Sequence, residues 1–166
     1  MDQFKEQLVL VRNKTPYNMA KALMMVFFVI AMFFLVLGGA VFSIVFFVVS
    51  GAIWYLKRYF YVEYEYALTN GEIDIDAIYE MKKRKRQVTF NLKEVALLAP
   101  KDSDAYRDFS NKPTKIIKSI PTGNTERVYV AILTEGLTRA QIEFVPNKAF
   151  IDACFIFNPK AIKKNL

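Results

Sequence analysis

The sequence predicts an α+β membrane protein, in which an N-terminal transmembrane helical hairpin is followed by an antiparallel β-sandwich or barrel with a C-terminal helix as its cap. Three observations lead to this prediction. The 35 residues of 22–56 include no charged side chain, Asn70-Gly71 separates two alternating runs, and a helical pattern over 147–158 ends before Pro159. The first observation indicates a membrane segment, and the other two indicate a β-rich domain that ends in a helix.

The uncharged stretch is too long for one membrane span. As a single helix, residues 22–56 would extend roughly 52 Å at about 1.5 Å per residue. A bilayer core is only about 30 Å thick and takes about 20 residues. Gly38-Gly39 near the middle is the natural place for a turn. We therefore expect a transmembrane hairpin over 16–58, with helices at 16–37 and 40–57.

The charges around the hairpin predict its orientation. The turn 37–41 carries no charge, whereas both ends of the hairpin are flanked by cations. These cations are Arg12, Lys14, Lys21, Lys57 and Arg58. By the positive-inside rule, the N-terminus and the C-terminus both lie in the cytoplasm of a two-span protein of the cell membrane. A single tilted span, which would put the domain outside, is the alternative.

Residues 1–15 are expected to form a cytosolic or interfacial segment ahead of the hairpin. Phe4, Leu8 and Val11 recur at helical spacing over 3–12. This pattern predicts either a short helix lying in the membrane interface or a frayed tail.

The clearest local signal in the β domain, residues 59–166, is a hairpin. Asn-Gly between two strand-like runs is typical of a two-residue turn. With Thr69 opposite Glu72, one face of the hairpin is entirely apolar or aromatic, which supports this register. The opposed pairs on that face are Leu68–Ile73, Tyr66–Ile75, Tyr64–Ala77 and Val62–Tyr79.

Further strands and a final helix complete the predicted domain. Alternating or apolar runs predict strands at 87–92, 94–98, 115–120, 127–134 and 138–145, with the last two joined around Glu135-Gly136. The polar segment 101–110 has room for one short helix. Phe150, Ala153, Cys154 and Phe157 give residues 147–158 an apolar stripe, so this helix is expected to close one end of a bent sheet.

Three segments carry a resemblance to a known family. They are YEYALTNGEIDID (Tyr64–Asp76), VYVAIL (Val128–Leu133) and FVPNKAFIDA (Phe144–Ala153). Together they resemble an uncharacterised family of small two-span bacterial membrane proteins with a C-terminal pleckstrin-homology-like (PH-like) domain. The resemblance implies a strongly twisted sheet closed by the last helix. It implies no activity for any residue, because the family has none assigned.

The net charge of +7 is concentrated in one place. Residues 57–166 carry 19 basic and 14 acidic side chains, and five consecutive residues account for the difference. These are Lys82, Lys83, Arg84, Lys85 and Arg86. PH-like domains often use a basic loop between early strands to contact lipid, and this run falls between the second and third predicted strands. The run therefore predicts contact with anionic lipid headgroups or with a membrane partner.

The alternative is that the basic run balances charge within the domain. The predicted hairpin register places Glu65 opposite Asp76, and like charges directly opposed are destabilising. The same acidic face also carries Glu63 and Asp74. These four carboxylates match no calcium loop, so we expect no metal site and no cofactor.

Several function classes have little support. The chain has no histidine, and its one cysteine, Cys154, lies on the apolar stripe of the last helix. Ser43 and Ser50 lie in the membrane segment without a base to activate them. No catalytic residue is therefore predicted, and the localised charge does not suit nucleic-acid binding.

These features favour a membrane-anchored, non-enzymatic module that binds anionic lipid headgroups or a membrane partner. The alternative function is an accessory subunit of a larger membrane complex, with the hairpin as the contact surface. Small residues such as Ala31, Gly51 and the two serines would allow close helix packing there.

Overall fold

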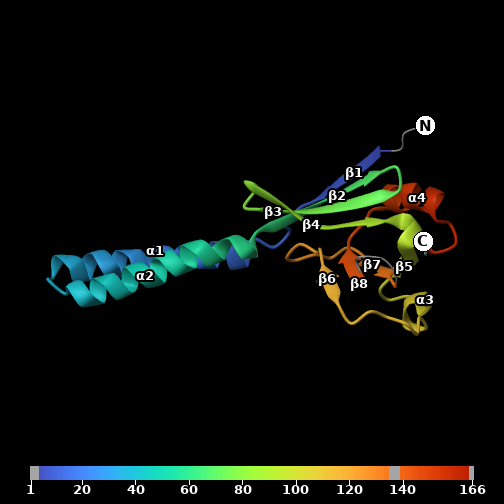
Figure 1. Ribbon diagram of the computed structural model, residues 1–166. Helices are drawn as coiled ribbons and strands as arrows, with labels where there is room; N and C mark the ends of the chain where they lie inside the picture. Colours follow the sequence, from blue (N-terminus) through green and yellow to red (C-terminus); the bar gives the residue numbers. More distant parts are fainter. Residues whose placement is uncertain (1–3, 135–138, 165–166) are drawn as a thin grey trace.

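The computed structural model describes residues 4–134 and 139–164. Two long helices, α1 (Thr15–Val36) and α2 (Ala40–Leu56), lie side by side and extend away from a β domain (Figure 1). A short 3-10 helix, η1 (Lys57–Phe60), leads from α2 into the domain. The bounds of α1 and α2 lie within one residue of those predicted from the sequence. Helix α1 and the continuous helical stretch Ala40–Phe60, which is α2 together with η1, are long and apolar enough to cross a membrane.

The two helices pack through small and aromatic residues. Ala31, Ser43 and Ser50 are buried in the pair, and the Ser50 hydroxyl donates a hydrogen bond to the carbonyl of Met24 at 3.0 Å. Small side chains let two helix backbones approach closely. Gly38 makes the turn with a φ of +79°, in the left-handed region that glycine adopts without a steric penalty. The small residues therefore hold the hairpin itself together.

The first sheet has the order β1-β2-β3-β4, and all of its neighbours are antiparallel. Its strands are β1 (Phe4–Val9), β2 (Val62–Thr69), β3 (Glu72–Tyr79) and β4 (Lys83–Asn91). The β2–β3 hairpin has the predicted register, with Leu68 opposite Ile73 and Tyr66 opposite Ile75. Asn70 and Gly71 have φ values of 50° and 90°, as a two-residue turn with positive φ at both positions requires.

The expectation of a helix or a frayed tail over residues 3–12 is wrong. Residues 4–9 form strand β1, which pairs with β2 from Thr69 to Tyr64. Phe4 and Leu8 point outward, whereas Val9 is buried. The side chains thus alternate with a period of two, and the helical spacing was coincidental. The strand forms because β2 presents a row of backbone hydrogen-bonding groups along its edge. Residues that precede the helix pair in the sequence and residues that follow it therefore belong to one sheet.

The second sheet has the order β5-β7-β8-β6. Its strands are β5 (Val95–Pro100), β6 (Ile116–Lys118), β7 (Tyr129–Leu133) and β8 (Ala140–Phe144). The 3-10 helix η2 (Leu92–Glu94) connects the sheets, and the short helix α3 (Asp104–Arg107) follows β5. β6 runs parallel to β8, so this sheet is mixed. The predicted turn at Glu135-Gly136 lies outside the described residues.

The two sheets form a sandwich and not a closed barrel. Side chains bridge the open edges where a barrel would have a strand ladder. On the β4 side, Gln87 donates to the carbonyl of Lys118 at 3.0 Å. On the β1 side, Gln7 donates to the carbonyl of Val145 at 3.0 Å.

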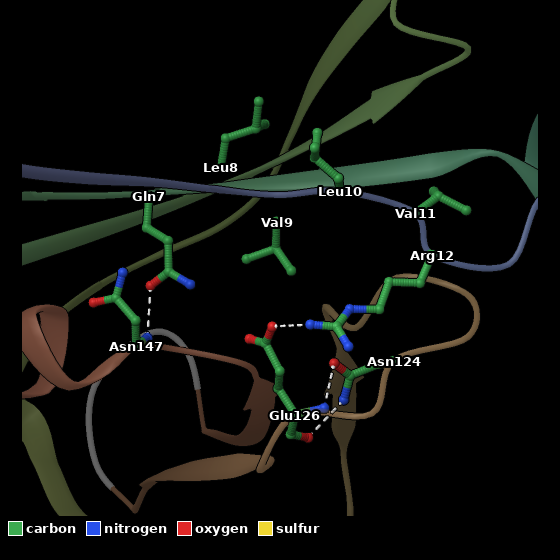
Figure 2. Close-up of a pocket in the computed structure, with 9 residues that line it drawn as sticks. All are labelled: Gln7, Leu8, Val9, Leu10, Val11, Arg12, Asn124, Glu126 and Asn147. Carbon is green, nitrogen blue, oxygen red and sulfur yellow. Dashed lines mark hydrogen bonds and ion pairs between the residues drawn. The ribbon is translucent and has the colours of Figure 1, made fainter.

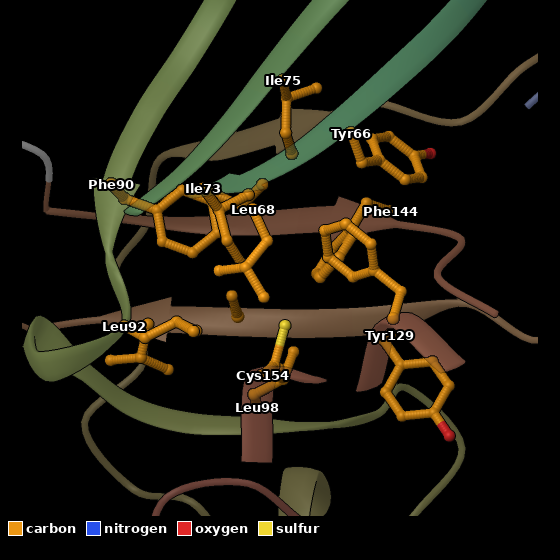
Figure 3. Close-up of a cluster of buried hydrophobic side chains, with 14 of the residues drawn as sticks. Tyr66, Leu68, Ile73, Ile75, Phe90, Leu92, Leu98, Tyr129, Phe144 and Cys154 are labelled. Atoms are coloured by element: carbon orange, nitrogen blue, oxygen red, sulfur yellow. The ribbon is translucent and has the colours of Figure 1, made fainter. Parts of the chain in front are cut away.

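The core lies between the sheets and under helix α4 (Lys148–Phe157), whose bounds lie within one residue of the prediction. Figure 3 shows side chains from both sheets meeting around the Cys154 thiol. Burial among apolar groups raises the pKa of this thiol to about 12, which keeps it protonated and inert at neutral pH. Cys154 is therefore a packing residue.

Tyr66 joins the two sheets through its hydroxyl as well as its ring. The hydroxyl donates to the carbonyl of Ser119 at 2.6 Å and accepts from the backbone N–H of Val145 at 3.2 Å. The ring packs edge-on against Phe144 and is fully buried.

We predict that Tyr66→Phe lowers the free energy of unfolding by about 1–3 kcal/mol, because two buried backbone groups lose their partner. Circular dichroism during denaturation of the full chain in detergent measures this. Tyr64→Phe is the control, since its half-buried hydroxyl makes no hydrogen bond to another described residue. Equal losses in the two variants would show that the Tyr66 hydroxyl has no such role.

Candidate functional site at the junction of helices and sheet

The basic run does not form a loop. Lys82 lies in the turn after β3, but the other four residues, 83–86, belong to strand β4. In a strand, successive side chains point to opposite faces of the sheet. The order Lys-Arg-Lys-Arg therefore divides the run, with arginines on one face and lysines on the other.

A β-bulge decides which face the arginines occupy. Ile75 pairs with Val88 but Asp76 pairs with Arg86, so Gln87 is an extra residue in β4. Simple alternation would put Arg86 on the same face as the buried Val88. The extra residue reverses the orientation and brings Arg86 onto the acidic face.

The two arginines balance the acidic face of the hairpin. Arg84 forms ion pairs with Glu65 and Asp76. Arg86 forms ion pairs with Asp74 and Asp76, and the hydrogen bond from Arg86 to Asp76 raises the arginine pKa. The carboxylate of Glu63 is buried and accepts a hydrogen bond from the Tyr61 hydroxyl at 3.2 Å. Within the described chain, no three acidic, Cys or His side chains are grouped to hold a metal ion.

The lysines have a different environment. Lys82, Lys83 and Lys85 are exposed and make no ion pair with any described residue. In the β4 register, Lys83 lies opposite Tyr79 and Lys85 lies opposite Ala77. They occupy the end of the sheet nearest the helices (Figure 1). The sequence identified all five basic residues but not this separation into paired arginines and unpaired lysines.

Lys83 and Lys85 line a cavity of about 190 Å³ between β4 and the end of the helix pair. The other lining residues are Tyr55, Arg58, Tyr59 and Tyr79. The Arg58 guanidinium lies 3.5 Å from the centre of the Tyr55 ring, and its Nε is buried without a hydrogen-bond partner among the described residues. The lining thus includes three cations, three phenol rings and no carboxylate.

An ion pair next to this cavity fixes the domain to the helices. The Lys57 ammonium bonds to the carboxylate of Glu80, and the Tyr17 hydroxyl donates to the same carboxylate at 2.9 Å. Lys57 is only 9% exposed, and its ammonium also lies 5.0 Å from the centre of the Tyr17 ring. We call this group, formed by Tyr17, Lys57 and Glu80, the junction triad. It joins α1, η1 and the β3–β4 turn.

The β3–β4 turn has a strained backbone. Glu80 and Met81 have φ values of 49° and 58°, in the left-handed region that disfavours residues with a Cβ. The backbone N–H of Glu80 donates to the carbonyl of Tyr61 at 3.0 Å, which helps to hold this conformation. Sequence reasoning placed Lys57 at the membrane boundary but missed Glu80, because only the tertiary structure brings the two together.

A second cavity, of about 510 Å³, opens along the free edge of β1 (Figure 2). Its polar side chains bond to each other across it. Arg12 forms an ion pair with Glu126 at 2.6 Å, and the side-chain Oε1 of Gln7 accepts a hydrogen bond from the backbone N–H of Asn147 at 2.8 Å. These groups attach β1 and the residues after it to the segments that flank β7 and β8, so we assign the cavity a structural role.

Comparison with known proteins identifies one family. The model of a family described as bacterial PH-like domain (DUF6106) matches residues 1–164, which confirms the resemblance found in the sequence. The search of curated proteins and the search of solved structures returned no match.

We predict that Glu80→Gln destabilises the full chain by about 3 kcal/mol at neutral pH, because it leaves the Lys57 ammonium buried without its counter-charge. The hydrogen bond from Lys57 lowers the pKa of Glu80 in the folded state. The stabilisation is therefore present above the ordinary glutamate pKa and is lost as the pH falls through the lowered value. Unfolding in detergent should show the difference between wild type and variant shrinking in acid.

The control is Glu126→Gln, which breaks an ion pair whose side chains are about half exposed. Exposed pairs contribute about 0–1 kcal/mol. If the Glu80 variant were no less stable than this control at neutral pH, the junction triad would not stabilise the fold.

Proposed function

The chain belongs to the bacterial PH-like domain family, and from this premise we propose that it is a membrane-anchored, non-enzymatic module whose domain binds anionic lipid headgroups at the bilayer surface. The helix pair is the anchor. The lysines at the helix-proximal end of the sheet are the contact surface.

The surface of the helix pair supports the anchoring. Met19, Val36, Val41 and Val48 each keep at least 66% of their surface exposed. Soluble monomers rarely expose contiguous apolar patches larger than a few hundred Å². Lipid tails would cover this surface along both helices, whose 22 and 17 residues suit a bilayer core once η1 extends the second.

The β1–β2 pairing supports a topology with two spans. β1 precedes the helices and β2 follows them, and six residue pairs join these strands. Two strands of one sheet lie on the same side of a membrane, so a chain that leaves that side must return to it. The cations at this end, among them Lys14, Lys57 and Arg58, favour the cytoplasmic side.

The observation that carries the lipid proposal is a set of three exposed lysines, Lys82, Lys83 and Lys85, which form no ion pair with the residues that the structure describes. A basic side chain near an anionic membrane surface contributes about 1 kcal/mol of attraction. The junction triad holds their hairpin next to the helix ends, where headgroups would lie. The neighbouring arginines are occupied by carboxylates, so they add little to this attraction.

A second candidate function, an accessory subunit of a membrane complex, is favoured by a groove on the helix pair. This groove of about 500 Å³ is lined almost wholly by apolar groups, including Phe28, Gly51 and Trp54. A Cβ added at Gly51 would meet no atom within 4 Å, so a partner helix could approach there. Crosslinking in native membranes to one defined protein would favour this function over a lone lipid-binding module.

We predict that nanodiscs of phosphatidylglycerol slow amide hydrogen exchange of residues 79–86 in the full chain, relative to nanodiscs of phosphatidylcholine. Changing Lys82, Lys83 and Lys85 together to Gln should abolish this difference. The control changes Lys93, Lys148 and Lys160 to Gln, which removes the same charge near α4, at the far end of the sheet (Figure 1). Equal exchange in the two lipids, or an equal effect of the control, would contradict the proposal.

The topology predicts where a membrane-impermeant maleimide reacts. Leu37→Cys lies in the turn between the helices and should be labelled in intact cells. Lys160→Cys lies in the domain and should be labelled only after permeabilisation. The native Cys154 is buried and gives little background. Labelling of both sites in intact cells would contradict a cytoplasmic domain.

A further inference from the structure

We propose that the cavity between Arg58 and β4 is a binding site for one phosphate group of an anionic phospholipid, seated where the second helix meets the sheet. This inference rests on the proposed function and deepens it, because it replaces a diffuse attraction to the surface with one defined site. It assigns the central role to Arg58, which lies outside the basic run.

Cations from distant parts of the chain converge on this cavity. Arg58 comes from η1, whereas Lys83 and Lys85 come from β4. The lining holds no carboxylate, and none of the three makes an ion pair with a described residue. Every arginine on the opposite face of β4 does have such a partner. Three convergent, uncompensated cations repel one another unless an anion lies between them.

The Arg58 side chain is held against an aromatic ring and has an unsatisfied donor. Its guanidinium stacks on the Tyr55 ring at 3.5 Å, which restricts the plane of the donors. Its buried Nε lacks a hydrogen-bond partner within the described structure. A buried donor without a partner costs about 1–3 kcal/mol, more when it is charged. Guanidinium groups bind phosphate in a two-pronged geometry, so a phosphate in the cavity would satisfy this donor after a small movement of the Arg58 side chain, because the Nε itself has almost no exposed surface in this structure.

The size and polarity of the cavity suit a phosphate group. Its volume of about 190 Å³ corresponds to roughly six water molecules at about 30 Å³ each, enough for a phosphate with part of its headgroup. The hydroxyls of Tyr55, Tyr59 and Tyr79 make no hydrogen bond to other described residues, so they are available as donors to the remaining phosphate oxygens.

The position of the cavity favours lipid over free phosphate. Tyr55 lies in the last turn of α2, and Tyr59 follows in η1. Tyrosines at the end of a span lie at the level of the headgroups. With the helix pair in a bilayer, a phospholipid of the adjacent leaflet would present its phosphate at this depth.

The test measures binding of short-chain phosphatidylglycerol, short-chain phosphatidylcholine and inorganic phosphate to the full chain in uncharged detergent by native mass spectrometry. We expect one phosphatidylglycerol to bind per chain. Arg58→Gln should weaken this binding about 10- to 100-fold, as loss of a charge-assisted hydrogen bond predicts. Arg58→Lys should recover part of the loss. Arg107→Gln, on the exposed surface of α3, should have no effect.

Three results would overturn the proposal. Unchanged binding by Arg58→Gln would exclude the cavity as the site. Displacement of the lipid by an equal concentration of inorganic phosphate would assign the cavity to a free anion. Equally tight phosphatidylcholine would exclude selectivity for an anionic headgroup. Lys85→Gln, at an exposed position, gives an independent loss of about tenfold if the Arg58 variants fold poorly.

The surface proposal and the site proposal can fail separately. If Arg58→Gln binds lipid normally while the triple lysine variant loses the exchange difference in nanodiscs, the surface attraction stands and the site does not. If neither change matters, both proposals fail.

Discussion

The fold depends on one constraint: strand β1, which precedes the helix pair, must pair with β2, which follows it. The sheet is complete only when the intervening 52 residues, from Leu10 to Tyr61, return the chain to its starting point. A tight helical hairpin with Gly38 at its turn does this. The same pairing makes the N-terminal segment part of the domain, so the helices are an insertion between two neighbouring strands of one sheet.

The junction between helices and sheet follows from that constraint. Both ends of the helical hairpin lie at the base of the first sheet, where Tyr17 and Lys57 contact Glu80. The β3–β4 turn that brings Glu80 to this largely buried ammonium has a left-handed backbone, and the ion pair helps to offset its steric cost. The result is a rigid base that holds the start of β4 next to the end of α2.

The proposed function is placed at this base because strand geometry separates the charges onto two faces. The bulge at Gln87 directs the arginines to the acidic face, where they neutralise the hairpin carboxylates. The lysines remain on the other face with Arg58 and the tyrosines. The arginines of the basic run thus supply internal charge balance, whereas its exposed lysines make no ion pair with a described residue and remain candidates for the proposed contact with lipid. The PH-like family and the apolar helices provide the setting in which such a surface would meet lipid.

Local patterns in the sequence were sufficient for the helix pair, the β2–β3 register and α4, because each depends on residues close together in the chain: Gly38-Gly39, Asn70-Gly71 and the apolar stripe before Pro159. They also located the basic run. Only the tertiary structure decided four other features. These are strand β1, the bulge at Gln87, the Lys57–Glu80 ion pair and the place of Arg58 beside Lys83 and Lys85. Each of these features depends on a partner tens of residues away in the sequence, or on one extra residue that changes which face of the sheet the side chains of a strand point to. Side chains along a single strand alternate between its two faces whichever face is buried. Only the neighbours that pack against the strand therefore determine which of the two faces is buried.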